Sequence, residues 1–325
     1  MSKQPFVSVI TPVFNGERFI GECVKSVLNQ TYKNFEYVVV NNCSTDRTYD
    51  ILLSFAKKDS RIRIYNNKEH LPILKNLNNS FLQMSEESKY CKVLHADDWL
   101  FPECIEKMVE VAERSDRVGI VSSYLLEGRR TDSYLLEQRE VKGVGLNYDK
   151  NIFSGKEICR LSLLGKGYFF GSPSTLLIRS EIIRNRVPFY SEDSIHTDYE
   201  VCLEILKDWD FGFVHQILSF SRVHENAHSS FAKRVNTYIL ENIRILKKYG
   251  KFYLTPQEID MMLKKRMKYY YRFLATSVFK KRTKEFWAYH LNGLKEIGEP
   301  LNVFKFLISF IIVVYNNILT NLILG

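Results

Sequence analysis

The fold of this chain is decided by Val7–Ile51, which reads VSVITPVFNGERFIGECVKSVLNQTYKNFEYVVVNNCSTDRTYDI. Two apolar runs, Phe6–Ile10 and Glu36–Val40, have the length of strands, and the second is continuous enough in valine to be buried on both faces. Between them, apolar side chains recur at helical spacing over Glu17–Asn29. A strand, a helix and a second strand in this order predict a βαβ unit with parallel strands.

The same alternation continues to residue 122. We expect further strands at Arg61–Tyr65, Cys91–His95 and Val118–Ser122, and further helices after Ser44 or Thr45, from Pro72 and over Pro102–Arg114. Repeated βαβ units predict a mainly parallel, doubly wound sheet, in which ligands bind beyond the carboxyl ends of the strands. The candidate binding loops are Thr11–Glu17, Asn41–Arg47, Asn66–Leu71 and Ala96–Phe101.

The second half of the chain has a different pattern. Strand and helix signals weaken over residues 128–151 and return in 167–183 and 196–206. From about residue 236 the pattern is helical, basic and rich in tyrosine, and the chain ends in a hydrophobic segment. We therefore expect an α/β domain over residues 1–235, a basic helical region over 236–300 and a hydrophobic helix over 301–325.

Composition excludes several classes of protein. With 325 residues, of which 45% are hydrophobic and 26% charged, the chain is expected to be an ordered globular protein. Its six cysteines are scattered without a CxxC pair, so neither a zinc site nor a disulfide framework is expected. No signal peptide precedes the first strand, which predicts that the N-terminal part lies in the cytoplasm.

The net charge of +9 is unevenly spread along the chain. Between Lys247 and Lys284, twelve Lys and Arg residues are accompanied by two acids, Glu258 and Asp260. A surface of this kind can bind nucleic acid or an anionic membrane. Because no nucleic-acid-binding motif accompanies the charge, nucleic acid is not an expected partner.

The last segment, Val303–Leu324, carries a single charge, Lys305, and its apolar run is interrupted by asparagines. A helix that spans a membrane needs about 20 predominantly apolar residues. A helix that lies in the membrane interface, or that packs between partner helices, therefore fits better than a lone span. The alternative is an ordinary core helix at the end of a solvated basic bundle.

The chain contains none of the glycine-rich loops that bind phosphate. Neither GxGxxG nor GxxxxGK[ST] is present, which disfavours a dehydrogenase or a P-loop enzyme. Phosphates would then need another positive partner, and a divalent cation held by carboxylates would serve. Asp97 and Asp98, in the stretch KVLHADDWLFP (Lys92–Pro102), follow an expected strand. One can bind a cation while the other holds a hydroxyl or the loop. Alternatively, Asp98 caps the helix near Pro102 and Asp97 is solvated.

Together, the opening stretch and KVLHADDWLFPECIEKMV (Lys92–Val109) resemble the family 2 glycosyltransferases, which have the nucleotide-sugar-binding GT-A fold. The resemblance covers roughly residues 5–230 and is most specific before residue 125. In that family, a T-P-x-[YF]-N loop wraps the nucleoside of the donor, often with a nearby Glu. The matching residues are Thr11, Pro12, Phe14, Asn15 and Glu17.

Two positions depart from the family's pattern. The base-binding loop usually reads D-D-x-S-x-D, and here it begins with Asn41 and Asn42, whose amides can still accept a hydrogen bond and can also donate one. Base recognition is expected to survive with a changed preference. The metal motif D-x-D-D reads His95-Ala96-Asp97-Asp98. The resemblance implies Mn²⁺ or Mg²⁺ at Asp97, donor contacts from Ala96 and Asp98, and either packing or cation binding for His95.

The resemblance also implies the residues that carry the chemistry. Family members have an acidic pair at the start of a helix, of which the Asp is the general base, and Asp198 occupies the matching position. A helix N-terminus would keep this carboxylate ionised. The other interpretation of Asp198 is a simple helix cap. The nearest rivals for the role of base are Asp193 and Glu200.

A Y-R-x-H segment in the family approaches the diphosphate, and Arg222 and His224 match it, with His224 as a second cation ligand beside Asp97. Both can also be ordinary surface residues. Trp99, Gly171 and Ser172 are implied on the acceptor side, although Gly171-Ser172 can equally form a turn before a strand at Thr175–Ile178.

The resemblance implies one in-line displacement. Asp198 takes a proton from an acceptor hydroxyl that attacks the anomeric carbon of a nucleotide-diphospho-sugar, with inversion at that carbon. The expected acceptor is a glycan or a lipid-linked intermediate of polysaccharide or cell-envelope synthesis, at the cytoplasmic face of a membrane. A non-catalytic relative that binds nucleotide or membrane is the alternative, motivated by Asn41, Asn42 and His95.

Overall fold

The computed structural model describes residues 4–130, 136–142, 146–192, 196–223, 234–280 and 282–324, without the side chains of 129–130, 136–142 and 317–324. The chain divides into two compact units, Met1–His224 and Glu225–Gly325.

The first unit is built on one sheet, whose strands run in the order β3-β2-β1-β4-β9-β6-β10-β5. From β3 to β4 neighbouring strands are parallel, β9 is antiparallel to both its neighbours, and β10 is parallel to β6. The bounds of the strands are β1 Val7–Val13, β2 Phe35–Asn41, β3 Ile62–Asn66, β4 Tyr90–Val93, β5 Trp99–Leu100, β6 Val118–Arg130, β7 Leu136–Lys142, β8 Ile152–Phe153, β9 Leu177–Arg179 and β10 Asp210–Arg222. Off this path, β7 pairs with β6, and the two-residue β8 pairs with β10.

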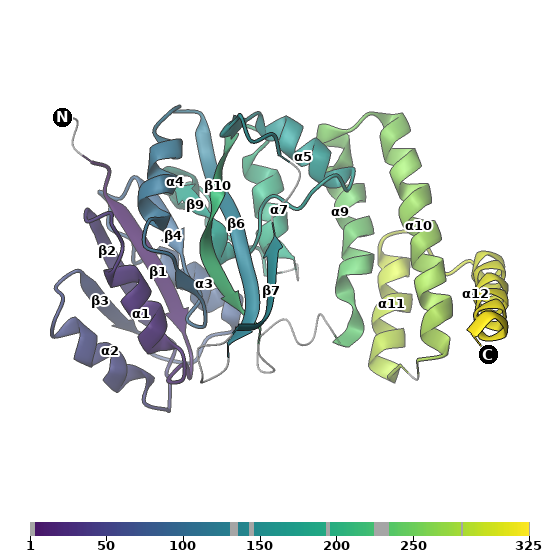
Figure 1. The fold of residues 1–325 in the computed structure, drawn as a ribbon, viewed down its shortest axis with the longest axis horizontal. Coiled ribbons are helices and arrows are strands. Elements are labelled where there is room, and N and C mark those ends of the chain that lie inside the picture. Colours follow the sequence, from purple (N-terminus) through teal and green to yellow (C-terminus); the bar gives the residue numbers. More distant parts are fainter. Residues whose placement is uncertain are drawn as a thin grey trace. The chain divides into compact units, whose positions relative to one another are not determined.

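Helices cover both faces of the sheet, as a doubly wound arrangement requires. Figure 1 shows α1 and α2 in front of the strands and α3 behind them. Alternation along β1 explains the division, because Val7 and Val9 enter the core that α1 and α4 complete, whereas Ile10 points to the other side. The helices of this unit are α1 Ile20–Leu28, α2 Thr48–Ala56, α3 Ile73–Phe81, α4 Cys104–Ala112, α5 Gly155–Leu163, α6 Ser180–Arg184 and α7 Thr197–Ile205.

This architecture confirms the α/β class and the mostly parallel sheet expected from the sequence. All seven residues of β2 are buried, as its run of valines predicts. Two features differ from expectation. β6 continues to Arg130, beyond the point where the pattern weakens, and the predicted strand at Thr175–Ile178 is a 3-10 turn at Pro173–Thr175 followed by β9.

The second unit is helical, as expected. Its helices are α9 Thr237–Tyr253, α10 Pro256–Val278, α11 Lys284–Glu296 and α12 Val303–Leu324. The N-termini of three of them are capped: Thr255 and Glu258 form a capping box on α10, the hydroxyl of Thr283 accepts from the backbone of Phe286 on α11, and Oδ1 of Asn302 accepts from the N–H of Lys305 on α12. In Figure 1, α9, α10 and α11 run side by side, while α12 is seen end-on beside α10. Within the described part of the chain, none of the helices has the length and hydropathy needed to cross a membrane.

Candidate active site

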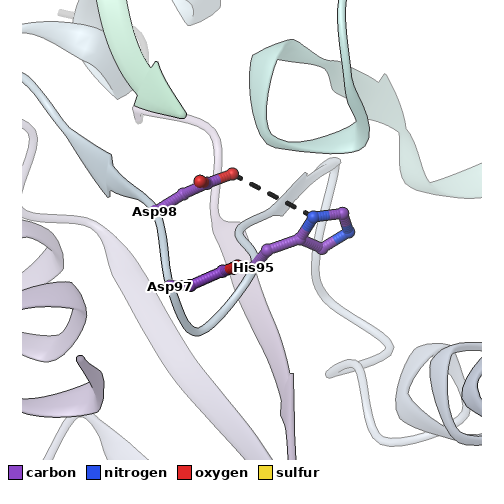
Figure 2. Close-up of side chains that lie close together, drawn as sticks. All are labelled: His95, Asp97 and Asp98. Atoms are coloured by element: carbon purple, nitrogen blue, oxygen red, sulfur yellow. Dashed lines mark ion pairs between the residues drawn. The ribbon is translucent and has the colours of Figure 1, made fainter. Parts of the chain in front are cut away.

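His95, Asp97 and Asp98 form a compact cluster in the loop between β4 and β5. One ligand atom from each of the three lies within 4.8 Å of the others. Figure 2 shows the imidazole of His95 directed toward the carboxylate of Asp98, and Nδ1 of His95 lies 4.0 Å from Oδ2 of Asp98. Two carboxyl groups and an imidazole at this spacing form a donor set suited to a divalent cation. The loop that the sequence singles out is thus a candidate metal site.

Asp98 is the buried member of the cluster, with 3% of its surface exposed. Its Oδ2 accepts a hydrogen bond from the hydroxyl of Ser174 at 2.6 Å, and its Oδ1 accepts from the backbone N–H of Arg222 at 3.0 Å. Its carboxylate therefore ties the loop to β10 and to the turn before β9. The alternative in which Asp98 caps the helix near Pro102 is wrong, because α4 begins at Cys104 and has no side-chain cap.

Burial and, to a smaller extent, the charge of the neighbouring Asp97 raise the pKa of Asp98 to about 6, although His95 and the two hydrogen bonds act to lower it. Between pH ~4 and pH 6, Asp98 therefore keeps its proton in the folded chain and has lost it in the unfolded chain. The stability that this proton contributes is complete below pH ~4 and is lost as pH rises through 6, and it amounts to at most about 3 kcal/mol.

We expect this loss to be visible in a comparison with Asp98→Asn. In the presence of a chelator, the unfolding free energy of the wild type minus that of Asp98→Asn should fall between pH 4 and pH 7, because the variant has no proton to lose at this position. Urea titrations at several pH values measure the difference. A difference that is constant over this range would contradict the burial of an ionisable Asp98.

Arg222, at the end of β10, holds the other side of the loop. Its Nε donates to the backbone oxygen of Asp97 at 3.0 Å, and its terminal nitrogen pairs with Glu22 of α1 at 2.6 Å. The guanidinium also lies over the rings of Phe19 and Trp99, at 4.4 and 5.2 Å from their centres. Arg222 therefore positions Asp97, and its role toward a diphosphate stays a prediction. The other half of that pair, His224, lies outside the described residues.

Asp198 lies in the first turn of α7, as expected. Burial raises the pKa of Asp198, although backbone N–H groups of Tyr199 and of Asp198 itself, and the charge of His95, act to lower it. Desolvation is the largest of these effects, and the role of Asp198 as general base stays a prediction. Of its rivals, Glu200 is buried, and Asp193 lies outside the described residues.

The loops after β1 and β2 are fastened to each other. Oδ1 of Asn15 accepts from the N–H of Thr45 at 2.8 Å, and the N–H of Asn15 donates to the hydroxyl of Ser44 at 3.0 Å. Glu17 accepts from the N–H of Arg47 and donates its own N–H to Asp46, both at 3.0 Å. These bonds hold Asn15 in a left-handed conformation at φ 48°. Asn15 and Glu17 thus give the expected donor loop a rigid shape.

The other residues expected in the donor loop differ in exposure. Thr11 is fully buried and accepts a hydrogen bond from the hydroxyl of Tyr37 at 3.1 Å, and Pro12 is partly buried. Phe14 is 47% exposed, and its ring meets that of His70 edge-on at 4.4 Å. Phe14 is therefore an exposed aromatic side chain of this loop against which a ligand can pack. Ala96 lies beside the same loop, 3.8 Å from where a Cβ on Gly16 would stand.

Asn41 and Asn42 belong to a network of amides that the sequence did not predict. Nδ2 of Asn41 donates to Oδ1 of Asn66 at 2.9 Å. Oδ1 of Asn42 accepts from Asn67 at 2.8 Å and from the N–H of Leu71 at 2.9 Å, and its Nδ2 donates to the oxygen of Leu71 at 2.8 Å. The neutral side chains of both asparagines are therefore held by the loop after β3. The sequence feature that could have indicated this network is the pair Asn66-Asn67, which directly follows the expected strand Arg61–Tyr65.

The residues expected on the acceptor side occupy structural positions. Gly171 has φ +66°, and a Cβ there would lie 2.3 Å from the hydroxyl of Thr175, so the position requires glycine. The backbone oxygen of Ser172 accepts from the same hydroxyl at 2.7 Å. The turn before β9 is thus present, as the alternative interpretation predicted. Trp99 stacks on Phe220 with ring centres 3.6 Å apart.

Lys92 is a residue of the site that sequence reasoning missed. It is fully buried in β4, and its Nζ donates to the backbone oxygens of Ser174 at 2.6 Å and Leu176 at 3.3 Å. Ser174 in turn donates to Asp98 and accepts from the N–H of His95 at 3.1 Å. Lys92 therefore supports the loop of His95, Asp97 and Asp98, the candidate metal site, through Ser174. A lysine inside the apolar run of an expected strand was the available signal.

Comparisons with known proteins give one consistent family. The profile described as "Glycosyl transferase family 2" matches residues 8–185. An uncharacterized glycosyltransferase of Haemophilus influenzae is 30% identical over 239 residues, which are 71% of this chain and 69% of the relative. The putative teichuronic acid biosynthesis glycosyltransferase TuaG of Bacillus subtilis is 35% identical over 113 residues, 34% of this chain and 44% of TuaG.

Solved structures share the fold at low sequence identity. Residues 1–349 of S. aureus TarS in complex with UDP-GlcNAc match with a TM-score of 0.63 and 17% identity, covering 90% of this chain and 80% of that one. The mannosyltransferase PcManGT from Pyrobaculum calidifontis, in complex with GDP-Man and Mn²⁺, matches with a TM-score of 0.55 and 15% identity, covering 90% of this chain and 81% of that one.

Proposed function

Because this chain belongs to glycosyl transferase family 2 and is a glycosyltransferase, we propose that it moves a sugar from a nucleotide-diphospho-sugar to a hydroxyl of a glycan or lipid-linked acceptor, with inversion at the anomeric carbon. The expected GT-A fold, followed by C-terminal helices, is confirmed. One observation carries the proposal: ligand atoms of His95, Asp97 and Asp98 lie within 4.8 Å of one another in the loop after β4, which makes that loop a candidate cation site.

Asp198 is proposed as the general base. Its carboxylate removes the proton from the acceptor hydroxyl as that oxygen attacks the sugar, and a raised pKa makes it a stronger base than an exposed aspartate. The oxygen gains a bond to the anomeric carbon, while the bond from that carbon to the diphosphate breaks. Phe14 and the fastened loops after β1 and β2 are proposed to hold the nucleoside, and Trp99, Gly171 and Ser172 to line the acceptor side.

Mn²⁺ or Mg²⁺ is proposed as the cofactor. The residues present fit such an ion, since ligand atoms of His95, Asp97 and Asp98 lie within 4.8 Å of one another. Asp97 would be the main ligand, because both oxygens of Asp98 already accept hydrogen bonds from Ser174 and Arg222. A bound divalent ion would supply positive charge to the leaving diphosphate. The proposal also places His224 beside Asp97 as a second ligand.

The setting of the reaction is part of the proposal. We assign transfer to residues 1–235, and we assign residues 236–300 and 301–325 to contact with the cytoplasmic face of a membrane. Similarity to the teichuronic acid protein TuaG supports a role in polysaccharide or cell-envelope synthesis.

A panel of nucleotide-diphospho-sugars with Mn²⁺ or Mg²⁺ tests the proposed function. We expect one class of donor, in the presence of metal, to raise the melting temperature and to release nucleoside diphosphate, because a ligand that binds only the folded state stabilises it. The control omits the metal. A chain that no donor stabilises would overturn the proposal and favour the non-catalytic alternative, for which the neutral Asn41 and Asn42 are the motive.

A further inference from the structure

One face of α12 is exposed and wholly apolar over the residues whose side chains are described. Six side chains at helical spacing are between 40% and 73% exposed, namely Phe304, Leu307, Ile308, Ile311, Ile312 and Tyr315. A contiguous apolar patch of this kind marks a protein or membrane interaction site.

The opposite face of α12 packs inside the second unit. Ser309 and Val313 are each 8% exposed, and the ring of Phe310 stacks on that of Phe279 at 5.4 Å. In a surface helix of a soluble protein the apolar side faces the core and the polar side faces water. In α12 both faces carry apolar side chains, since Phe310 and Val313 pack inward beside Ser309 while isoleucines point outward.

Basic side chains lie on the neighbouring helix. Lys264, Lys265, Lys268 and Arg272 are exposed and recur at three- and four-residue spacing, so they share one face of α10. The C-terminal part of α10 lies beside the start of α12, since the hydroxyl of Tyr271 accepts from the N–H of Asn302 at 2.9 Å. The basic side chains lie on the turns of α10 around and before Tyr271. Within the second unit, an apolar surface therefore adjoins a positively charged one.

We propose that these two helices dock on a bilayer surface that contains anionic lipid, with the apolar face of α12 inserted among the headgroups and the basic face of α10 against the lipid charges. An apolar face flanked by Lys and Arg binds an anionic interface through both burial and electrostatic attraction. A second copy of the chain is a poorer occupant, because it would bring two basic surfaces together. This inference deepens the proposed function, because it names the surface at which a lipid-linked acceptor would be reached. It rests on the proposed function for that acceptor alone, and the docking itself is argued from α10 and α12.

Co-sedimentation of the full chain with lipid vesicles tests the insertion of α12. We expect binding to vesicles of phosphatidylcholine with phosphatidylglycerol, and a loss of roughly tenfold or more in Ile311→Glu, because a charge on the inserted face must be desolvated. Leu82→Glu, at an exposed leucine of the first unit, is the matched control and should bind like the wild type. Equal binding of Ile311→Glu and wild type would overturn the insertion.

A second pair of variants tests the contribution of the basic face of α10 to vesicle binding. Lys265→Gln/Lys268→Gln should bind anionic vesicles roughly 30-fold more weakly, and Lys57→Gln/Lys58→Gln, on exposed lysines of the first unit, should not. Binding that is unchanged in both pairs, or equally strong on pure phosphatidylcholine, would overturn the requirement for anionic lipid.

Light scattering separates the membrane from a second copy. We expect a monomer without lipid. A dimer that Ile311→Glu dissociates, together with no vesicle binding by the wild type, would overturn the proposal in favour of self-association. Donor, metal and acceptor are absent from all these measurements. A chain that does not bind vesicles would therefore overturn the docking and leave the proposed transfer reaction untouched. Conversely, a chain that transfers no sugar would still be expected to bind vesicles.

Discussion

Asp97→Ala is expected to lower the rate of sugar transfer by on the order of 10³-fold, because a cation held at this position would lose its main carboxylate. The fold should survive the change. The loop is fastened through other atoms, since Asp98 bonds to Ser174 and Arg222 bonds to the backbone oxygen of residue 97. Released nucleoside diphosphate, followed while Mn²⁺ is titrated, measures the effect, and excess metal should not restore the wild-type rate.

Asp50→Ala is the matched control for Asp97→Ala. It removes an exposed carboxylate from α2 and should leave the rate unchanged. If Asp97→Ala turned over as fast as Asp50→Ala at every metal concentration, Asp97 would not be the cation ligand. A loss of rate accompanied by a lower melting temperature would instead point to a structural role, and it would also contradict the assignment.

The strands at the start of the chain could be predicted because their signals are local. The valine run of β2 and the helical spacing of α1 follow from burial within each element, and the parallel order of β1 and β2 follows from the helix between them. The candidate site was predictable in the same sense, since Asp97 and Asp98 lie in the loop that follows β4.

The support of the site could not be predicted, because it depends on pairings between distant parts of the chain. β10 lies beside β6 with three shifts in register, and its last residue, Arg222, donates its backbone N–H to Asp98, 124 positions earlier. Lys92 reaches the oxygen of Ser174 across 82 positions. No periodicity within a segment carries such information, so the sequence indicated the acidic loop as a candidate cation site and did not predict the contacts that hold the loop.

The asparagines show a different limit. A motif comparison identifies Asn41 and Asn42 as replacements of carboxylates, but it cannot say what a neutral amide does there. In the structure their amide groups bond to Asn66, Asn67 and Leu71. A carboxylate has no N–H to donate to the oxygens of Asn66 and Leu71, so the replacement suits this neighbourhood. The two asparagines therefore make hydrogen bonds here that aspartates could not make.

Asp198→Asn is expected to lower kcat by about 10²–10⁴-fold with little change in the KM of the donor, because an amide keeps the shape of the side chain but cannot accept the proton of the acceptor. Burial raises the pKa of Asp198, so kcat of the wild type should fall, as pH decreases, through a value above that of an exposed aspartate. The residual activity of Asp198→Asn should lack this acidic limb. Glu204→Gln, on the same helix and paired with Lys207, is the control and should retain both rate and pH profile. An acidic limb that persists in Asp198→Asn would assign it to another group, and the buried Glu200 would then be the next residue to test.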